Sequence, residues 1–129
     1  MHQYDDTNIF ARIIRGELSC NKVYEDEQVI AFHDIHKAAP VHVLVLPKGR
    51  YISFHDFTTT AAPQEVADFF TKVRVITEQL ELVGSGYRLV ANHGSDGSQT
   101  VPHFHVHILG KRRLGAIVSG DTYHERVQG

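Results

Sequence analysis

The sequence predicts an α+β fold, with a five-stranded antiparallel sheet, one long helix on one face and a short helix near the N-terminus. Two observations support this prediction. Five short segments are rich in apolar and β-branched residues and end at turn-forming residues, as strands do. One longer segment, between the third and fourth of them, repeats apolar residues at helical spacing. One helix inserted into a series of strands favours a helix layer on an antiparallel sheet.

The first half of the chain predicts the short helix and three strands. Thr7 or Asn8 can cap a helix over Ile9–Arg15, whose apolar residues share one face, and Gly16 ends it. Prolines on both sides confine the third strand, because proline cannot donate to a ladder. The three strands are expected at Lys22–Glu25, Val29–His33 and His42–Leu46.

The second half predicts the long helix and the last two strands. The helix is expected over Pro63–Leu82, because apolar residues recur there at three- and four-residue steps and proline suits the first turn. A fourth strand follows at Tyr87–Ala91, and a loop rich in glycine and hydroxyl groups spans Asn92–Thr100. The fifth strand is expected at His103–Leu109, after a proline and before a glycine.

Length and composition indicate one domain. The chain has 129 residues, which suits a single domain over 1–129 with irregular tails at 1–6 and 115–129. The formal net charge of −2 supplies no general basic surface for nucleic acid. The longest apolar runs are far shorter than the ~18 residues of a membrane span. The single cysteine excludes an internal disulfide or a cysteine cluster for a metal. We therefore expect a cytoplasmic protein.

Histidine is the unusual feature of the composition. The chain has 10 histidines, and some of them occupy alternate positions of the last predicted strand. Because side chains alternate along a strand, these imidazoles share one face and apolar residues fill the other. The imidazole face carries His103, His105 and His107, and the apolar face carries Phe104, Val106 and Ile108.

Three interpretations of this row are open on the residues alone. It can be a solvated strand face that happens to be rich in histidine. Histidines two positions apart on a strand can also ligate zinc through neutral imidazoles, with water completing a catalytic site. The third interpretation is nucleophilic catalysis at phosphorus, in which one neutral imidazole attacks and its neighbour moves a proton. The ordinary pKa of histidine, about 6.5, suits both roles.

The run His103–Leu109 resembles the His-φ-His-φ-His-φ-φ signature of the histidine triad (HIT) superfamily, where φ is apolar. Further blocks match the family in order, from Asn8 to Gly110. They include residues 31–35, 39–47, 86–92 and 94–100, and the last makes the Hint branch, the histidine triad nucleotide-binding proteins, the closest match.

This resemblance implies the HIT fold and a hydrolase of purine nucleoside 5′-phosphoramidates, of the adenosine 5′-monophosphoramidate type, that needs no cofactor or metal. In that scheme His105 attacks the α-phosphorus and forms a covalent nucleotidyl-histidine, which water then cleaves. His107 handles the charge and the proton, and the backbone carbonyl of His103 sets the tautomer of His105. His42 supports the row from another strand, and Thr100 assists the leaving group.

The resemblance also implies where a purine nucleoside monophosphate binds. Asp34 is expected to bind the ribose hydroxyls. The expected phosphate contacts are His105, His107, Asn92, Ser98, Gln99 and Thr100, and the expected base slot is Ile9, Phe10, Ile13, Leu18, Phe32 and Ile35. Without the resemblance, the same loop is an ordinary turn and the apolar residues are core. An apolar slot favours purines without separating adenine from guanine.

Some features depart from the Hint pattern. Ser98 stands where a second glycine is usual and Thr100 where serine is common, so we expect a slightly narrower site. The tail lacks the Trp-Pro-Pro ending that reaches the partner subunit in some Hint proteins, and the basic run 111–113 is interpreted as a solvated turn. The resemblance alone implies a homodimer, with the sheet extended across it. The rival functions are a dinucleoside polyphosphate hydrolase of the same superfamily and a nucleotide-binding interaction module with incidental catalysis.

Overall fold

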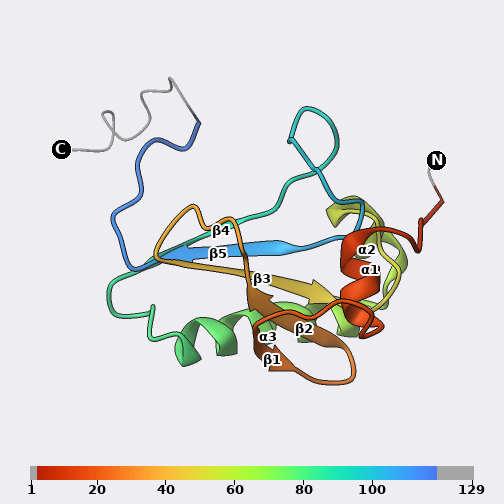
Figure 1. Cartoon of the computed structure of the whole chain (residues 1–129), viewed down its shortest axis with the longest axis horizontal. Coiled ribbons are helices and arrows are strands. Elements are labelled where there is room, and N and C mark those ends of the chain that lie inside the picture. The colour runs from red at the N-terminus through yellow and green to blue at the C-terminus, as the bar shows by residue number, and fades with distance from the viewer. Residues whose placement is uncertain (1–2, 119–129) are drawn as a thin grey trace.

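A five-stranded antiparallel sheet forms the centre of the computed structural model, which describes residues 3–118 (Figure 1). The strands lie in the order β1-β2-β3-β5-β4, so β1 and β4 are the edges. The elements are α1 (Ile9–Ile14), β1 (Lys22–Glu25), β2 (Val29–His33), β3 (Val41–Pro47), α2 (Phe54–Thr60), α3 (Pro63–Gln79), β4 (Tyr87–Val90) and β5 (Val106–Gly110). The α+β class, the antiparallel sheet and the long helix predicted from the sequence are confirmed.

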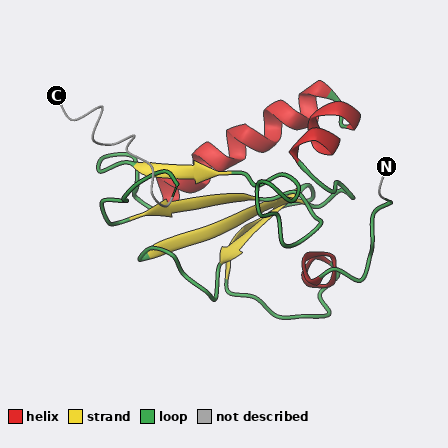
Figure 2. Cartoon of the chain, turned by 90° about the horizontal axis from the view of Figure 1, so that it is seen from above, coloured by secondary structure: helices red, strands yellow, loops and turns green. Residues whose placement is uncertain are grey.

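Both faces of the sheet are covered by apolar residues, and a different helix lies on each (Figure 2). On the α3 face, alternate residues of β2, β3 and β5 pack against α2 and α3, with Phe57, Phe69 and Phe104 among the fully buried side chains. On the other face, Phe32 and the neighbouring apolar residues of β2 and β3 pack against Phe10 of α1. The α1 face is the one that carries the imidazole row.

Local signals begin each helix. The side chain of Asn8 accepts a hydrogen bond from the backbone N–H of Ala11 and so caps α1. Ser53 accepts from the N–H of Asp56 and caps α2 in the same way. Pro63 occupies the first turn of α3, where its missing N–H costs nothing, and no side chain caps that helix.

Both predicted helices end earlier than expected, α1 at Ile14 rather than Arg15, and a third helix is absent from the prediction. The long helix ends at Gln79 rather than at Leu82. The helix α2 was missed, because its sequence, FHDFTTT, is rich in threonine, a weak helix former. The Ser53–Asp56 pair is a capping signal that identifies the start of α2 in the sequence alone.

The last strand begins later than predicted. Regular pairing of β5 starts at Val106, whereas the sequence pattern suggests His103. Before that point the chain forms other backbone bonds, because the N–H of His103 donates to Val101 and the N–H of Phe104 donates to Tyr51. Within residues 3–118 no helix is both long enough and apolar enough to cross a bilayer. The predicted tail at 115–129 lies mostly outside the described residues.

Candidate active site

The histidine row keeps its alternation although only its last member lies in β5. Phe104, Val106 and Ile108 are buried in the α3 core, so the three imidazoles face the α1 side. His103 is fully buried and His105 is 6% exposed. The rings of His105 and His107 lie with their centroids 5.0 Å apart. Two titratable rings therefore sit side by side on one face.

His105 is held in one tautomer by the backbone. Its Nδ1 lies 2.7 Å from the carbonyl oxygen of His103. A carbonyl can only accept, so Nδ1 carries the proton and Nε2 keeps its lone pair. Burial lowers the pKa of His105, and the bond to the His103 carbonyl only partly opposes this. At neutral pH the ring is uncharged, with Nε2 as a potential nucleophile.

His107 is held in the opposite tautomer by a chain that begins at the backbone N–H of Ala38. That N–H donates to Nδ1 of His42 (3.0 Å), so His42 carries its proton on Nε2. Nε2 of His42 in turn lies 2.9 Å from Nδ1 of His107, which therefore accepts. His107 is left with its proton on Nε2. Burial, with repulsion from His105 and His42, lowers the pKa of His107 to about 4.

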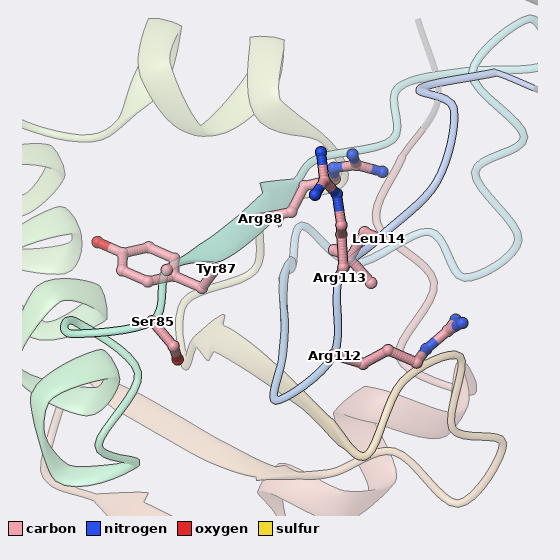
Figure 3. A pocket seen from close by; sticks show the side chains of 7 residues that line it. Ser85, Tyr87, Arg88, Arg112, Arg113 and Leu114 are labelled. Carbon is pink, nitrogen blue, oxygen red and sulfur yellow. The ribbon is translucent and has the colours of Figure 1, made fainter. Parts of the chain in front are cut away.

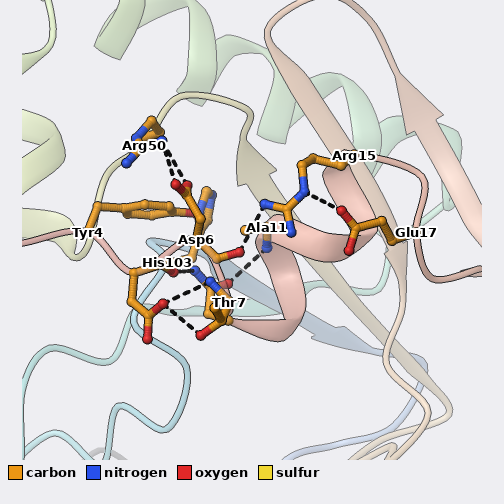
Figure 4. Close-up of polar contacts among 10 residues, drawn as sticks. Tyr4, Asp6, Thr7, Ala11, Arg15, Glu17, Arg50 and His103 are labelled. Carbon is orange, nitrogen blue, oxygen red and sulfur yellow. Dashed lines mark hydrogen bonds and ion pairs between the residues drawn. The ribbon is translucent and has the colours of Figure 1, made fainter.

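His103 is fixed on both nitrogens. Its Nε2 lies 2.8 Å from the carbonyl of Pro47, and its Nδ1 accepts from the hydroxyl of Tyr4 at 2.6 Å. Figure 4 shows the Tyr4 ring between His103 and Arg50, whose guanidinium lies 5.1 Å from the ring centroid. Arg50 is itself paired with Asp6 at 2.8 Å. Burial lowers the pKa of His103 to about 4. Sequence reasoning missed Tyr4, which lies 99 residues from its partner.

Asp34 lies directly after β2, beside the His42–His107 pair. Its Oδ2 is 3.4 Å from Nε2 of His42, and its Oδ1 accepts from the N–H of His36. The structure therefore places this carboxylate, for which the family resemblance implies ribose binding, next to the imidazoles. The pKa of His42 is lowered by burial, and the negative charge of Asp34 partly opposes that effect.

Asp34, His42 and His107 also form a possible metal-ligand set, since one ligand atom from each lies within 4.8 Å of the others. The sequence interpretation expects no metal, and its zinc alternative rests on the alternate histidines rather than on this set. Zinc holds nitrogen ligands at about 2.0–2.1 Å, and each must present a lone pair. The hydrogen bond between His42 and His107 must therefore break before both rings can bind one ion.

The loop Asn92–Thr100 is held together by its own amide side chains. Asn92 donates to the carbonyl of Gly97 at 2.7 Å. Gln99 accepts from the N–H of Gly94 and donates to the carbonyls of Ile52 and Val101. The Gln99 amide, expected at the phosphate, is thus occupied at both ends, its oxygen by Gly94 within the loop and its NH2 group by Ile52 and Val101 outside it. Ser98 has φ of +59°, a conformation that suits glycine better. Thr100 is exposed.

The residues expected in the base slot divide into two groups. Phe10 and Phe32 are buried in the α1 core, and the Phe10 ring packs edge-on against His105 with centroids 4.9 Å apart. Ile13 packs against the same cluster. Ile9 and Ile35 are instead 49% and 87% exposed, and Leu18 is half-buried. The structure thus places the buried Phe10 beside His105 and leaves Ile9 and Ile35 exposed.

Comparison with known proteins agrees with this fold. The model of the HIT domain family matches residues 15–114. A HIT-like protein of Azospirillum brasilense is 45% identical over 116 residues, which are 90% of this chain and 95% of that protein. A protein of Zea mays named a 14 kDa zinc-binding protein is 38% identical, over 85% of this chain and 86% of its own.

A solved structure supports the same assignment. The HIT family hydrolase from Legionella pneumophila superposes with a TM-score of 0.79 at 33% identity, over 84% of this chain and 96% of that chain. This fold thus recurs in proteins of similar length. On this evidence the chain belongs to the HIT domain family.

Proposed function

We propose that this protein is a hydrolase of purine nucleoside 5′-phosphoramidates that acts through a covalent intermediate on His105. The observation that supports the proposal most is the pair of opposite tautomers. His105 presents a lone pair on Nε2, and His107 beside it carries a proton on Nε2. A nucleophile next to a hydrogen-bond donor is the arrangement that displacement at a phosphoryl group requires.

The reaction proceeds in two displacements. In the first, Nε2 of His105 bonds to phosphorus and the P–N bond of the substrate breaks, and its nitrogen leaves with the electron pair and takes up a proton. In the second, water bonds to phosphorus and the bond to His105 breaks, which releases the nucleoside monophosphate and a proton. His107 donates a hydrogen bond to the phosphoryl oxygens or the leaving nitrogen, and Thr100 assists at the leaving group.

Asp34 supports a nucleoside rather than a simple phosphate ester as the substrate. A carboxylate beside the imidazoles can accept hydrogen bonds from both ribose hydroxyls. Ile9 and Ile35 offer exposed apolar surface to a purine. Asn92, Ser98 and Gln99 complete the proposed phosphate contacts, and Gln99 does so only if it releases its present partners.

Turnover of adenosine 5′-phosphoramidate, followed by a rapid acid quench, tests the proposal. Mass spectrometry should find an adenylyl group on His105. His105→Ala should abolish turnover and leave AMP binding measurable by calorimetry, because the groups around Asp34 remain. Unchanged turnover in this variant would refute the nucleophile assignment. His33→Ala is the matched control, because His33 lies on β2 outside the row.

The same assay separates the rival functions. Faster hydrolysis of diadenosine triphosphate than of the phosphoramidate would favour a dinucleoside polyphosphate hydrolase. A cellular role that survives His105→Ala would favour a nucleotide-binding interaction module. The third rival is a metal hydrolase, with Asp34, His42 and His107 as candidate ligands and the name of the maize protein as a precedent. It requires that activity is lost with a chelator and returns with zinc.

We also propose a homodimer. The edge strand β4 leaves one side of its backbone unpaired within the described residues, and large apolar side chains are exposed beside it. They are Tyr87 and Leu89 on β4 and Val83, four residues before it. Analytical ultracentrifugation measures the mass directly, and a monomer at micromolar concentration would contradict this. The cytoplasmic location stays a prediction of the sequence.

A further inference from the structure

Three arginines gather where β4 and β5 meet the segment that follows β5. Arg88, Arg112 and Arg113, which we call the arginine cluster, line a cavity of about 220 Å³ together with Ser85 and neighbouring residues (Figure 3). Arg112 and Arg113 also line a second cavity, of about 750 Å³. The sequence predicts a solvated turn at 111–113, and the structure shows these residues exposed; they also line these cavities.

The arginine cluster carries uncompensated positive charge. Within residues 3–118, none of its members pairs with a carboxylate, whereas ion pairs occupy Arg12, Arg15, Lys22, Lys48, Arg50, Lys72 and Arg74. Neutral carbonyls position the cluster instead. Arg88 donates to Gly115 at 3.0 Å and Arg112 donates to Ala38 at 3.4 Å. A carbonyl orients a guanidinium without neutralising it, so the site attracts anions.

Arg88, the member of the cluster that lies in a strand, is on the same face of the sheet as the histidines. In the β4–β5 ladder Arg88 pairs with Leu109 and Val90 pairs with His107, so Arg88 and His107 project from the same face as diagonal neighbours. Such neighbours are about 7–8 Å apart at the backbone, within reach of a long side chain. Arg112 is linked to the histidines through Ala38, whose carbonyl accepts from Arg112 and whose N–H donates to His42.

The face therefore has opposite charges on its two sides. The strand order places β2, with Asp34 at its end, on one side of β3 and β5, and β4, with Arg88, on the other. In-line attack by His105 on a nucleoside whose ribose binds at Asp34 puts the leaving nitrogen on the far side of phosphorus. The β4 side of the face is then open to the group that this nitrogen carries.

We propose that the arginine cluster is a leaving-group subsite that selects amines carrying an oxyanion, a carboxylate or a phosphate. This inference rests on the proposed function, because that function supplies the direction in which the substrate lies across the face. Guanidinium groups bind both kinds of oxyanion through paired N–H donors, which a neutral amine cannot engage. The preferred substrate is then a nucleoside phosphoramidate whose amine bears a negative group a few bonds from nitrogen.

The test compares three adenosine phosphoramidates of matched length, formed with propylamine, β-alanine and O-phosphoethanolamine. For the wild-type protein we expect kcat/KM to be about tenfold or more higher for either anionic amine than for propylamine. A preference for β-alanine alone identifies a carboxylate site, and one for phosphoethanolamine alone a phosphate site. Equal kcat/KM for all three would overturn the inference.

Variants link this preference to the cluster. Arg88→Gln and Arg112→Gln should each remove most of the anionic preference, whereas Arg74→Gln, on the exposed surface of α3, should keep it. A preference that survives in the double variant would overturn the inference. The same compounds are also titrated into His105→Ala by calorimetry, which measures their binding without turnover. If the wild type hydrolyses none of them, the proposed function fails. The subsite is then judged by binding alone, and equal affinity for the three compounds would refute it.

Discussion

The variant Tyr4→Phe, which removes one hydroxyl group, tests how much the hydrogen bond from Tyr4 to His103 stabilises the buried end of the imidazole row. The Tyr4 hydroxyl donates to Nδ1 of His103 at 2.6 Å, and His103 is fully buried. The other nitrogen of His103 is already used by Pro47, so the ring cannot flip to satisfy Nδ1 elsewhere. A buried acceptor without a partner costs about 1–3 kcal/mol. The phenylalanine ring keeps the edge-on contact with His103 and the stacking under Arg50.

We therefore expect Tyr4→Phe to lower the free energy of unfolding by about 1–2 kcal/mol. Each kcal/mol corresponds to a fall of about 3–5 °C in Tm for a domain of this size. Because the carbonyl of His103 orients His105, kcat should fall while KM for adenosine phosphoramidate changes little. Urea denaturation and steady-state kinetics measure the two effects. The control is Tyr24→Phe, whose hydroxyl donates to Asp26 near the surface. Loss of less than about 0.5 kcal/mol would refute the buried-acceptor argument.

The other predictions concern the pH dependence of stability and activity and the recognition of ribose. The pKa values of His103 and His107, about 4, lie below those of the unfolded chain, so the unfolded state binds more protons as pH falls. The contribution of these two rings to the free energy of unfolding should be fully present above about pH 6.5. It should decline toward pH 4, by up to about 1.4 kcal/mol per pH unit for each ring. Urea midpoints that stay constant from pH 7 to 5 would contradict this. The fall of kcat/KM at low pH should occur below the ordinary histidine pKa, because burial lowers the pKa of His105. A fall that already begins above pH 7 would argue against a buried nucleophile. Asp34→Asn should reduce the preference for adenosine over 2′-deoxyadenosine phosphoramidate about tenfold, since a charge-assisted hydrogen bond contributes about 1.5–3 kcal/mol. An unchanged ratio would place the ribose elsewhere.

The alternation of side chains along an extended chain made much of the sheet and of the imidazole row predictable. The strands β1 and β2 lie where the pattern of apolar residues and turns places them. The opposite orientation of His105 and Val106 also follows from a period of two. That period holds from His103 onward, although regular pairing starts three residues later, because the extended backbone alternates with or without a ladder.

Contacts between distant segments were not predictable in the same way. Tyr4 reaches His103 across 99 residues, and nothing in the sequence marks this pair. His42 reaches His107 across 65 residues, and only the family resemblance indicates that His42 supports the row. The arginine cluster is similar, because Arg88 joins Arg112 and Arg113 only through the pairing of β4 with β5. The role of Gln99 was obscured for another reason, since an amide that closes a loop and an amide that binds phosphate look alike in a sequence.

The proton positions of the row originate in the main chain. The N–H of Ala38, the carbonyl of Pro47 and the carbonyl of His103 assign the hydrogens on His42, His103 and His105. Exchanging side chains that do not contact the histidines therefore leaves this arrangement intact, as long as His42 and Tyr4 are kept and the backbone keeps its path. Substrate preference can therefore be engineered through residues that do not contact the histidines. An insertion or deletion near these peptide groups would instead change the tautomers of the histidines and so abolish the proposed catalysis.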